Sequence, residues 1–274
     1  MSSTCVESLP CHDCGSPGGR QVYLNKDDDL GVEWYTSFCH SACWEQKGDP
    51  YTDGVEAPKV IVKTAHEIWQ EVKTITTCPI FIPKKPYRSI PSEAYKSWKL
   101  RVLLSEYDGK TPYALGFPMS CDLSLSGFKI RPFRKKAFFG IGQTSNCDPF
   151  GLVRALRIPS RILWVTEGEF DAIALDYCLS KVTLKKQFPV ISLTHGGGSI
   201  EKNFNHIADI LDDYDEIRLV LDDDEVGHKA ESTAIRMYGN KIKLISKPDG
   251  CKDANDAVEN GKTTEMGKLA LLEL

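Results

Sequence analysis

The sequence predicts an α/β protein with a parallel sheet and flanking helices in its C-terminal part, an α+β region before it, and a small cysteine-rich segment at the N-terminus. Three observations lead to this expectation. Short apolar runs alternate with helical segments after residue 157, and continuously apolar runs are typical of parallel strands covered on both faces. The preceding region is irregular and rich in proline and aromatic residues. The first 50 residues combine paired cysteines with few apolar side chains.

The chain has 274 residues, which is enough for about two domains with cores of their own. We expect four consecutive segments, at residues 1–50, 51–62, 63–156 and 157–274. The first holds too few apolar residues for a core and therefore needs a covalent or metal staple. Gly54 and Pro58 mark the second as a linker. The third is expected to be a subdomain with short strands, such as the run at 100–107.

The composition is that of a soluble globular protein, with 41% hydrophobic and 26% charged residues. The formal net charge of −4 argues against a protein that coats nucleic acid by charge alone. No apolar run approaches the roughly 20 residues that a membrane span needs. The N-terminus lacks the basic and apolar regions of a secretory signal. We therefore expect a cytoplasmic protein without a membrane partner.

Four predicted strands alternate with four predicted helices in the C-terminal part. The strands are expected at residues 162–167, 189–194, 217–222 and 241–246, and the helices at 170–179, 200–211, 226–238 and 252–258. In such sheets the ligand binds beyond the carboxyl ends of the strands. Glu167, the turn at 195–198, the run at 222–225 and Asp253 all fall at such ends or just past them.

Four adjacent carboxylates, Asp222, Asp223, Asp224 and Glu225, follow the third predicted strand. Because side chains alternate in an extended chain, Asp222 and Asp224 are expected on one side. Two carboxylates at a strand end suit magnesium, which keeps water molecules that substrate phosphates can replace. Glu167 would add a third oxygen or act as a general acid or base. The alternative is that these acids are helix N-caps and first-turn charges, the interpretation we give to Asp223 and Glu225.

Paired cysteines predict a zinc site in the first segment. Two residues separate Cys11 from Cys14, three separate Cys39 from Cys43, and 24 lie between the pairs. Four thiolates hold zinc tetrahedrally and would supply the folding free energy that this segment lacks. His40 stays open as an alternative ligand. Nearby polar and aromatic residues are either contacts for single-stranded DNA or ordinary surface residues: Arg20, Lys26, Trp34 and Tyr35.

A basic strip at residues 127–142, GFKIRPFRKKAFFGIG, interleaves cations with aromatic residues. The cations are Lys129, Arg131, Arg134, Lys135 and Lys136, and the rings are Phe128, Phe133, Phe138 and Phe139. This pattern suits a surface that binds phosphates by charge and stacks bases on rings. Strand alternation puts Lys129 and Arg131 on one face. A solvated edge strand protected by lysine is the alternative. Lys229, in the predicted helix at 226–238, joins the candidate nucleotide- and DNA-binding residues.

Three stretches, VTEGEFDAIAL (165–175), LVLDDDEVGHKA (219–230) and KDANDAV (252–258), resemble the TOPRIM signature. More narrowly, they resemble the primase half of bacteriophage primase–helicases, the group that includes mitochondrial Twinkle. The resemblance implies that magnesium, or manganese in its place, is held by Glu167 with Asp171, by Asp222 and Asp224, and by Asp253. It also implies a zinc ribbon that reads the template, although the family typically has two C-x2-C pairs. The turn THGGGS (194–199) matches a glycine-containing loop of the family, or is a plain strand-to-helix turn, and we take its His195 to be structural.

From this resemblance we expect a DNA primase that joins ribonucleoside triphosphates on single-stranded DNA by metal-dependent nucleotidyl transfer, for phage replication in the host cytoplasm. A replicative helicase and a DNA polymerase are the expected partners. No G-x4-G-K-[ST] stretch is present, so helicase activity is not expected from these residues. Three alternatives stay open: a TOPRIM nuclease, a haloacid-dehalogenase-type phosphatase with Asp222 as nucleophile, and a non-catalytic accessory protein that binds zinc and DNA.

Overall fold

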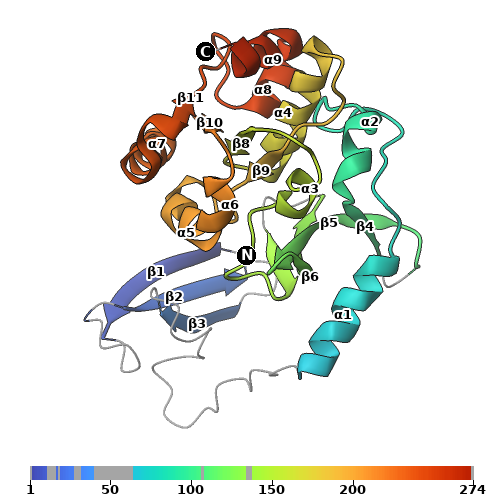
Figure 1. Ribbon diagram of the computed structural model, residues 1–274. Helices are drawn as coiled ribbons and strands as arrows, with labels where there is room; N and C mark the ends of the chain where they lie inside the picture. Colours follow the sequence, from blue (N-terminus) through green and yellow to red (C-terminus); the bar gives the residue numbers. More distant parts are fainter. Residues whose placement is uncertain are drawn as a thin grey trace. The chain divides into compact units, whose positions relative to one another are not determined.

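The computed structural model describes residues 2–10, 17, 19–27, 32–39, 64–105, 108–133 and 138–272 (Figure 1). The chain forms two compact units, Met1–Thr64 and Ala65–Leu274. None of the described helices is both long and apolar enough to cross a membrane. The predicted linker at 51–62 lies outside the described residues, and the predicted division near residue 156 stays a prediction.

The described part of the first unit is an antiparallel sheet. Its strands are β1 (Ser2–Leu9), β2 (Arg20–Asp27) and β3 (Val32–Cys39), in the order β1-β2-β3. Its buried hydrophobic residues, among those described, are Val22 and Cys39. This small core agrees with the expectation that the segment needs a further source of stability.

The second unit begins with an antiparallel sheet covered by one helix. The strands are β4 (Arg101–Leu104), β5 (Pro112–Cys121), β6 (Ser124–Pro132) and β7 (Phe139–Gly142), in the order β4-β5-β6-β7. The helix α1 (Ala65–Thr77) buries Val72 and Ile75 against Phe128 and Ile130 of β6 (Figure 1). Because side chains alternate along a strand, the residues between these two on β6 face the other way.

The predicted parallel sheet is confirmed. It consists of β8 (Ile162–Thr166), β9 (Val190–Ser192), β10 (Glu216–Val220) and β11 (Ile242–Leu244), all parallel, in the order β11-β10-β8-β9. The strands are shorter than the apolar runs that predicted them, because the last apolar residues continue past the ladder. Leu193 and Leu221 are fully buried just beyond their strands.

Helices cover both faces of the parallel sheet, which explains why its strands are mostly apolar. One group is α4 (Glu169–Val182), α8 (Ala254–Glu259) and α9 (Thr263–Leu272), and the other is α5 (Ile200–His206), α6 (Ala208–Asp212) and α7 (Glu225–Tyr238) (Figure 1). Trp164 packs in the core of the first group, and its neighbours Leu163 and Val165 in the core of the second. The single helix predicted at 200–211 is wrong, because Ile207 leaves helical geometry (φ −116°, ψ 26°).

Short elements complete the second unit: α2 (Ser92–Tyr95), η1 (Lys96–Trp98), α3 (Leu152–Ala155), η2 (Gly197–Ser199) and η3 (Gly239–Lys241). One core cluster joins the two sheets, since Phe117 of β5 meets Phe170 of α4 edge-on with ring centroids 5.2 Å apart. The antiparallel sheet is therefore packed against the start of α4. This position brings one face of β6 close to the carboxyl ends of the parallel strands.

Candidate functional site

Two acids meet at the carboxyl edge of the parallel sheet. Glu167 directly follows β8 and Asp222 comes two residues after β10, and these neighbouring strands pair Thr166 with Val220. Glu167 Oε2 and Asp222 Oδ1 are buried and have no hydrogen-bond partner among the described residues. Burial, then Glu167, Asp253 and Asp224, raise the pKa of Asp222 to about 6. Without a cation, this arrangement concentrates negative charge where solvation is poor.

The glycine turn at 196–197 packs against Glu167. Gly196 has φ +76°, and a Cβ atom at either glycine would lie 3.1 Å from a carboxylate oxygen of Glu167. Larger residues would therefore crowd this carboxylate, and Gly196 also needs the left-handed backbone region. The contact with Glu167 explains why glycine occupies these two positions. Phosphate binding by the N–H groups of the turn stays a prediction.

Asp224 and Asp253 are both helix N-caps. Asp224 Oδ1 accepts a hydrogen bond of 2.9 Å from Gly227 N at the start of α7. Asp253 Oδ1 accepts one of 2.6 Å from Asp256 N at the start of α8. The N-cap alternative is therefore confirmed for Asp224, and the capping role of Asp253 is an additional finding. Capping uses one oxygen of each carboxylate, and metal binding by the second oxygen stays a prediction.

Asp171 lies beneath the acid cluster. Its Oδ1 accepts a hydrogen bond of 3.2 Å from Asn255 N, which links α4 to α8. Burial, then Asp253 and Asp222, raise its pKa well above the ordinary value. Asp171 thus joins the neighbouring acids, since its carboxyl is buried and Asp253 and Asp222 both act on it.

The remaining acids of the 222–225 run pair locally at the protein surface. Asp223 Oδ1 lies 3.1 Å from His228 Nε2, and Glu225 Oε1 accepts a hydrogen bond of 2.6 Å from Lys229 Nζ. All four side chains are exposed. The predicted nucleotide contact at Lys229 stays a prediction, and in this structure its partner is Glu225.

Lys129 and Arg131 lie on one face of β6, as predicted, while Phe128 and Ile130 are buried on the other. Lys129 Nζ donates a hydrogen bond of 2.6 Å to Glu169 Oε1 and one of 3.3 Å to Thr194 O. The idea that Phe128 stacks on bases is wrong, because its ring is only 1% exposed in the core under α1.

The ring of Phe138, and not that of Phe128, lies next to the cations of this face. Lys129 Nζ is 4.5 Å and the Arg131 guanidinium 5.5 Å from the centre of its ring. Phe138 is also largely exposed, at 42%. The cations and their aromatic partner therefore form a basic surface beside the loop that contacts Glu167.

Two site residues were missed by sequence reasoning, Glu169 and Arg88. Glu169 is buried and holds Lys129, and its position two residues after Glu167 was the available signal. Arg88 lies 4.7 Å from the ring centre of Phe170, which Arg131 also approaches at 5.0 Å. Burial and then the charge of Arg88 lower the pKa of Arg131. The guanidinium groups of Arg88 and Arg131 therefore lie close together at the ring of Phe170. Arg88 comes from an irregular segment that carries no sequence signal.

Several predicted site residues lie outside the described residues, namely Cys11, Cys14, His40, Cys43, Arg134, Lys135 and Lys136. Cys39, the remaining predicted zinc ligand, ends β3 and is buried. Within the described ranges, no group of three or more histidine, cysteine, aspartate or glutamate side chains is arranged to hold a metal ion. The zinc and magnesium sites therefore stay predictions.

Comparison with known proteins identifies the parallel-sheet region. Residues 164–258 match the Toprim-like family. A DNA helicase/primase of Enterobacteria phage T3 is 34% identical over 96 residues, which make up 34% of this chain and 15% of that protein. The chain thus matches a small share of this relative's length. The family match includes Asp222, so the phosphatase interpretation of that residue is not supported.

The fold of the chain is similar to solved primase structures. The primase fragment of the bacteriophage T7 primase-helicase protein has a TM-score of 0.60 at 21% identity, covering 97% of this chain and 99% of that one. A chain from T7 lagging-strand DNA polymerase interacting with primase domains of two gp4 subunits, bound to an RNA/DNA hybrid and dTTP, has a TM-score of 0.57 at 23% identity, covering 70% and 91%. The Aquifex aeolicus primase (zinc binding and RNA polymerase domains) has a TM-score of 0.50 at 14% identity, covering 76% and 56%. The resemblance to phage TOPRIM primases is confirmed.

Proposed function

We propose that this chain, which carries a Toprim-like domain within the fold of a phage primase fragment, is a DNA primase. It would join ribonucleoside triphosphates into short RNA primers on single-stranded DNA, for phage replication in the cytoplasm of the bacterial host. One observation carries the proposal. The unpartnered, buried oxygens of Glu167 and Asp222 lie at the strand ends next to the loop that Lys129 contacts.

Magnesium, or manganese in its place, fits the acids at this edge. Their donors are hard carboxylate oxygens, and the buried atoms Glu167 Oε2 and Asp222 Oδ1 lack partners among the described residues. Two protein carboxylates suffice for magnesium, which completes its shell with water and substrate phosphates. We assign Glu167 and Asp222 as its main ligands, with Asp224 and Asp253 contributing their second oxygens. When bound, magnesium would polarise the triphosphate and lower the pKa of the attacking 3′-hydroxyl.

The basic face of β6 would hold the triphosphate. Lys129 and Arg131 supply positive charge beside the acid pair, and Arg88 adds a third cation. Glu169 holds Lys129 at 2.6 Å and so fixes the direction of its ammonium group. Arg134, Lys135 and Lys136, which follow β6 in the sequence, would bind phosphates of the template backbone.

The N-terminal unit would bind zinc through Cys11, Cys14, Cys39 and Cys43 and select the start site on the template. In this role zinc supplies folding free energy and takes no part in chemistry. The predicted contacts for single-stranded DNA in this unit are Arg20, Lys26, Trp34 and Tyr35. A replicative helicase and a DNA polymerase are the proposed partners, in line with the T3 relative and the T7 complex described above.

Template-directed synthesis tests the proposal. The protein is incubated with a library of single-stranded DNA templates, labelled ribonucleoside triphosphates and magnesium. Wild type should give short RNA, Asp222→Asn should give none, and the exposed control Asp209→Asn should match wild type. Cys39→Ser should retain the chemistry and lose start-site choice. Absence of RNA from wild type on every template would refute the function.

A nuclease is the second candidate, since the same acids could support phosphodiester cleavage. Magnesium-dependent nicking of the DNA without nucleotide incorporation would favour it. It leaves the paired cysteines of the N-terminal unit without a role. A non-catalytic accessory protein is the third candidate, and it would be favoured if Asp222→Asn left every measured activity unchanged.

A further inference from the structure

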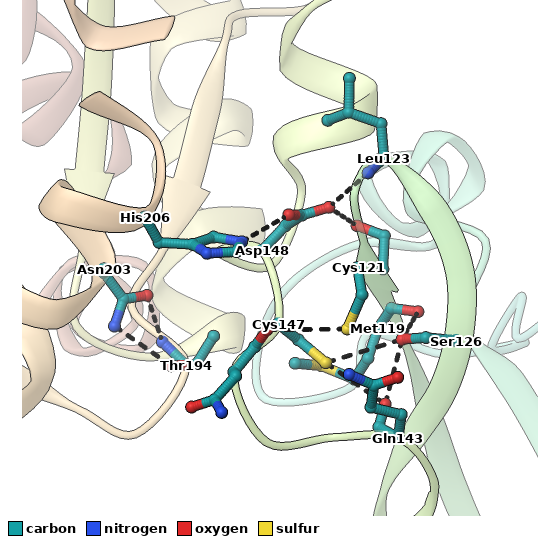
Figure 2. Close-up of polar contacts among 12 residues, drawn as sticks. Met119, Cys121, Leu123, Ser126, Gln143, Cys147, Asp148, Thr194, Asn203 and His206 are labelled. Atoms are coloured by element: carbon teal, nitrogen blue, oxygen red, sulfur yellow. Dashed lines mark hydrogen bonds and ion pairs between the residues drawn. The ribbon is translucent and has the colours of Figure 1, made fainter. Parts of the chain in front are cut away.

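A hollow of about 320 Å³ lies between the loop that follows β7 and the helix α5, and the loop that leads to Gly196 lines part of it. Most of the residues that line it are of polar types, among them Asn146, Thr194, His195, Lys202, Asn205 and His206. In Figure 2, Thr194 and Asn203 lie on one side and Cys147 lies on the other. The ring of His206 points toward Asp148. Its volume is at the lower end of the roughly 300–1,000 Å³ typical of small-molecule sites.

A buried carboxylate fixes one wall of this hollow. Asp148 is 3% exposed and accepts hydrogen bonds from Ser120 Oγ at 2.7 Å and from Leu123 N at 3.0 Å. Its other oxygen lies 3.0 Å from Nε2 of His206 (Figure 2). The imidazole is therefore held in one orientation from behind, while Nδ1 has no hydrogen bond among the described residues. A ring oriented in this way is prepared to contact a ligand.

The lining chemistry suits a nucleobase better than a phosphate. The carboxamides of Asn146 and Asn205 form no hydrogen bond with the described residues, and carboxamides pair with the donors and acceptors of base edges. Burial, then Lys129 and Lys202, lower the pKa of His195, which favours its neutral ring. Lys202 is the single lysine or arginine of the lining, whereas several cations gather on β6.

One loop connects the wall of the hollow to the proposed catalytic site. Two hydrogen bonds join Thr194 to Asn203. Thr194 N donates to Asn203 Oδ1 at 3.2 Å, and Asn203 Nδ2 donates to Thr194 Oγ1 at 3.1 Å. Thr194 O also accepts the bond from Lys129, and two residues later Gly196 meets Glu167. A nucleotide with phosphates near Lys129 thus has its base within reach of the hollow.

We propose that this hollow is a nucleobase subsite, in which Asn146, Asn205 and His206 read the edge of one base. The inference rests on the proposed function and adds to it the place where a base is chosen. The base belongs either to an incoming ribonucleotide or to the template strand. Both sources offer the same donors and acceptors, and two experiments distinguish them.

Binding measurements on two variants test the subsite. Asn205→Ala removes an exposed carboxamide from α5, and Asn146→Gly removes another at a residue whose φ of +55° glycine adopts without strain. Asn240→Ala, in η3 at the opposite end of the sheet, is the matched control. In the first arm, equilibrium dialysis measures the dissociation constants of the four ribonucleoside triphosphates separately with magnesium. In the second arm, anisotropy measures binding of short single-stranded DNAs that differ at one position.

We expect both variants to weaken binding of one or two bases by about 5- to 150-fold, with little change for the others, in one of the two arms. Selectivity lost in the first arm assigns the incoming base, and in the second arm the template base. An unchanged base profile in both arms, or an equal loss for all four bases, would overturn the subsite. Neither arm requires RNA synthesis, so failure of the subsite and failure of the primase function are separate results.

Discussion

Replacing Asp222 by asparagine should stabilise the metal-free protein while it abolishes activity. The pKa of Asp222 is raised from 3.8 to about 6, first by burial and then by Glu167, Asp253 and Asp224. At 1.36 kcal/mol per pH unit this rise corresponds to about 3 kcal/mol of destabilisation above pH 6. Solvent screens a half-buried carboxylate, so we expect about 1–2 kcal/mol. Asparagine keeps the shape and removes the charge.

The sign of the pH dependence follows from the direction of this shift. The folded protein binds a proton at Asp222 more tightly than the unfolded chain does. This carboxyl therefore makes the metal-free protein less stable as pH rises from about 4 to about 6, and its contribution is constant above that range. Asp176, whose pKa burial also raises to about 6, titrates in the same range, and comparison of wild type with Asp222→Asn removes its contribution. The comparison also includes Asp171, because the charge of Asp222 helps to raise the pKa of Asp171.

Urea denaturation with EDTA, from pH 4 to pH 8, measures the effect. The difference in unfolding free energy between Asp222→Asn and wild type should grow from near zero at pH 4 to about 1–2 kcal/mol at pH 7. Millimolar magnesium should stabilise wild type above pH 6 and stabilise the variant much less, because the variant lacks the charge of one main ligand. A variant that is less stable than wild type in EDTA at pH 7 would refute the reasoning.

Three further predictions concern the fold that holds the site. Gly227→Ala should lower the unfolding free energy by about 1–3 kcal/mol in thermal or urea denaturation, although alanine favours helices, because its Cβ would lie 2.1 Å from a backbone oxygen of the preceding loop. Arg154→Ala should cost about 3–5 kcal/mol by leaving the buried Asp176 unpaired, whereas Arg161→Ala, from an exposed pair, should cost under about 1 kcal/mol. Equal losses would contradict this ranking. Cys39→Ser should lower the zinc content measured by mass spectrometry and unfold the N-terminal unit. If wild type contains no zinc, the proposed zinc site is wrong.

The parallel sheet could be predicted from the sequence because its strands are buried on both faces. Continuous apolar runs such as 162–167 and 217–222 have few alternatives in a folded chain. The strand-end acids could be predicted for the same reason, since the carboxyl ends of parallel strands share an edge. Strand lengths were overestimated, because burial continues past the last ladder hydrogen bond at residues such as Leu221.

Other parts of the site depend on contacts that sequence patterns do not encode. The ion pair of Lys129 and Glu169 joins residues that are 40 positions apart in the sequence. Lys129 is on β6, and Glu169 is the first residue of α4. Arg88 reaches Phe170 from an irregular segment, where no periodicity indicates its direction. The prediction that Asp222 and Asp224 lie on one side stays a prediction, and Asp224 was found to cap α7, a role that competes with metal binding.

Manganese binding, followed by electron paramagnetic resonance in the presence of a ribonucleoside triphosphate, tests most directly whether Glu167 and Asp222 hold the catalytic cation. Wild type should bind manganese, and Glu167→Gln and Asp222→Asn should each weaken binding by at least about tenfold. This is a lower bound, because substitution of residues that only hydrogen-bond to metal ligands already weakens binding about tenfold. The exposed control Asp209→Asn should bind as wild type does. Equal manganese affinity in all four proteins would contradict the account.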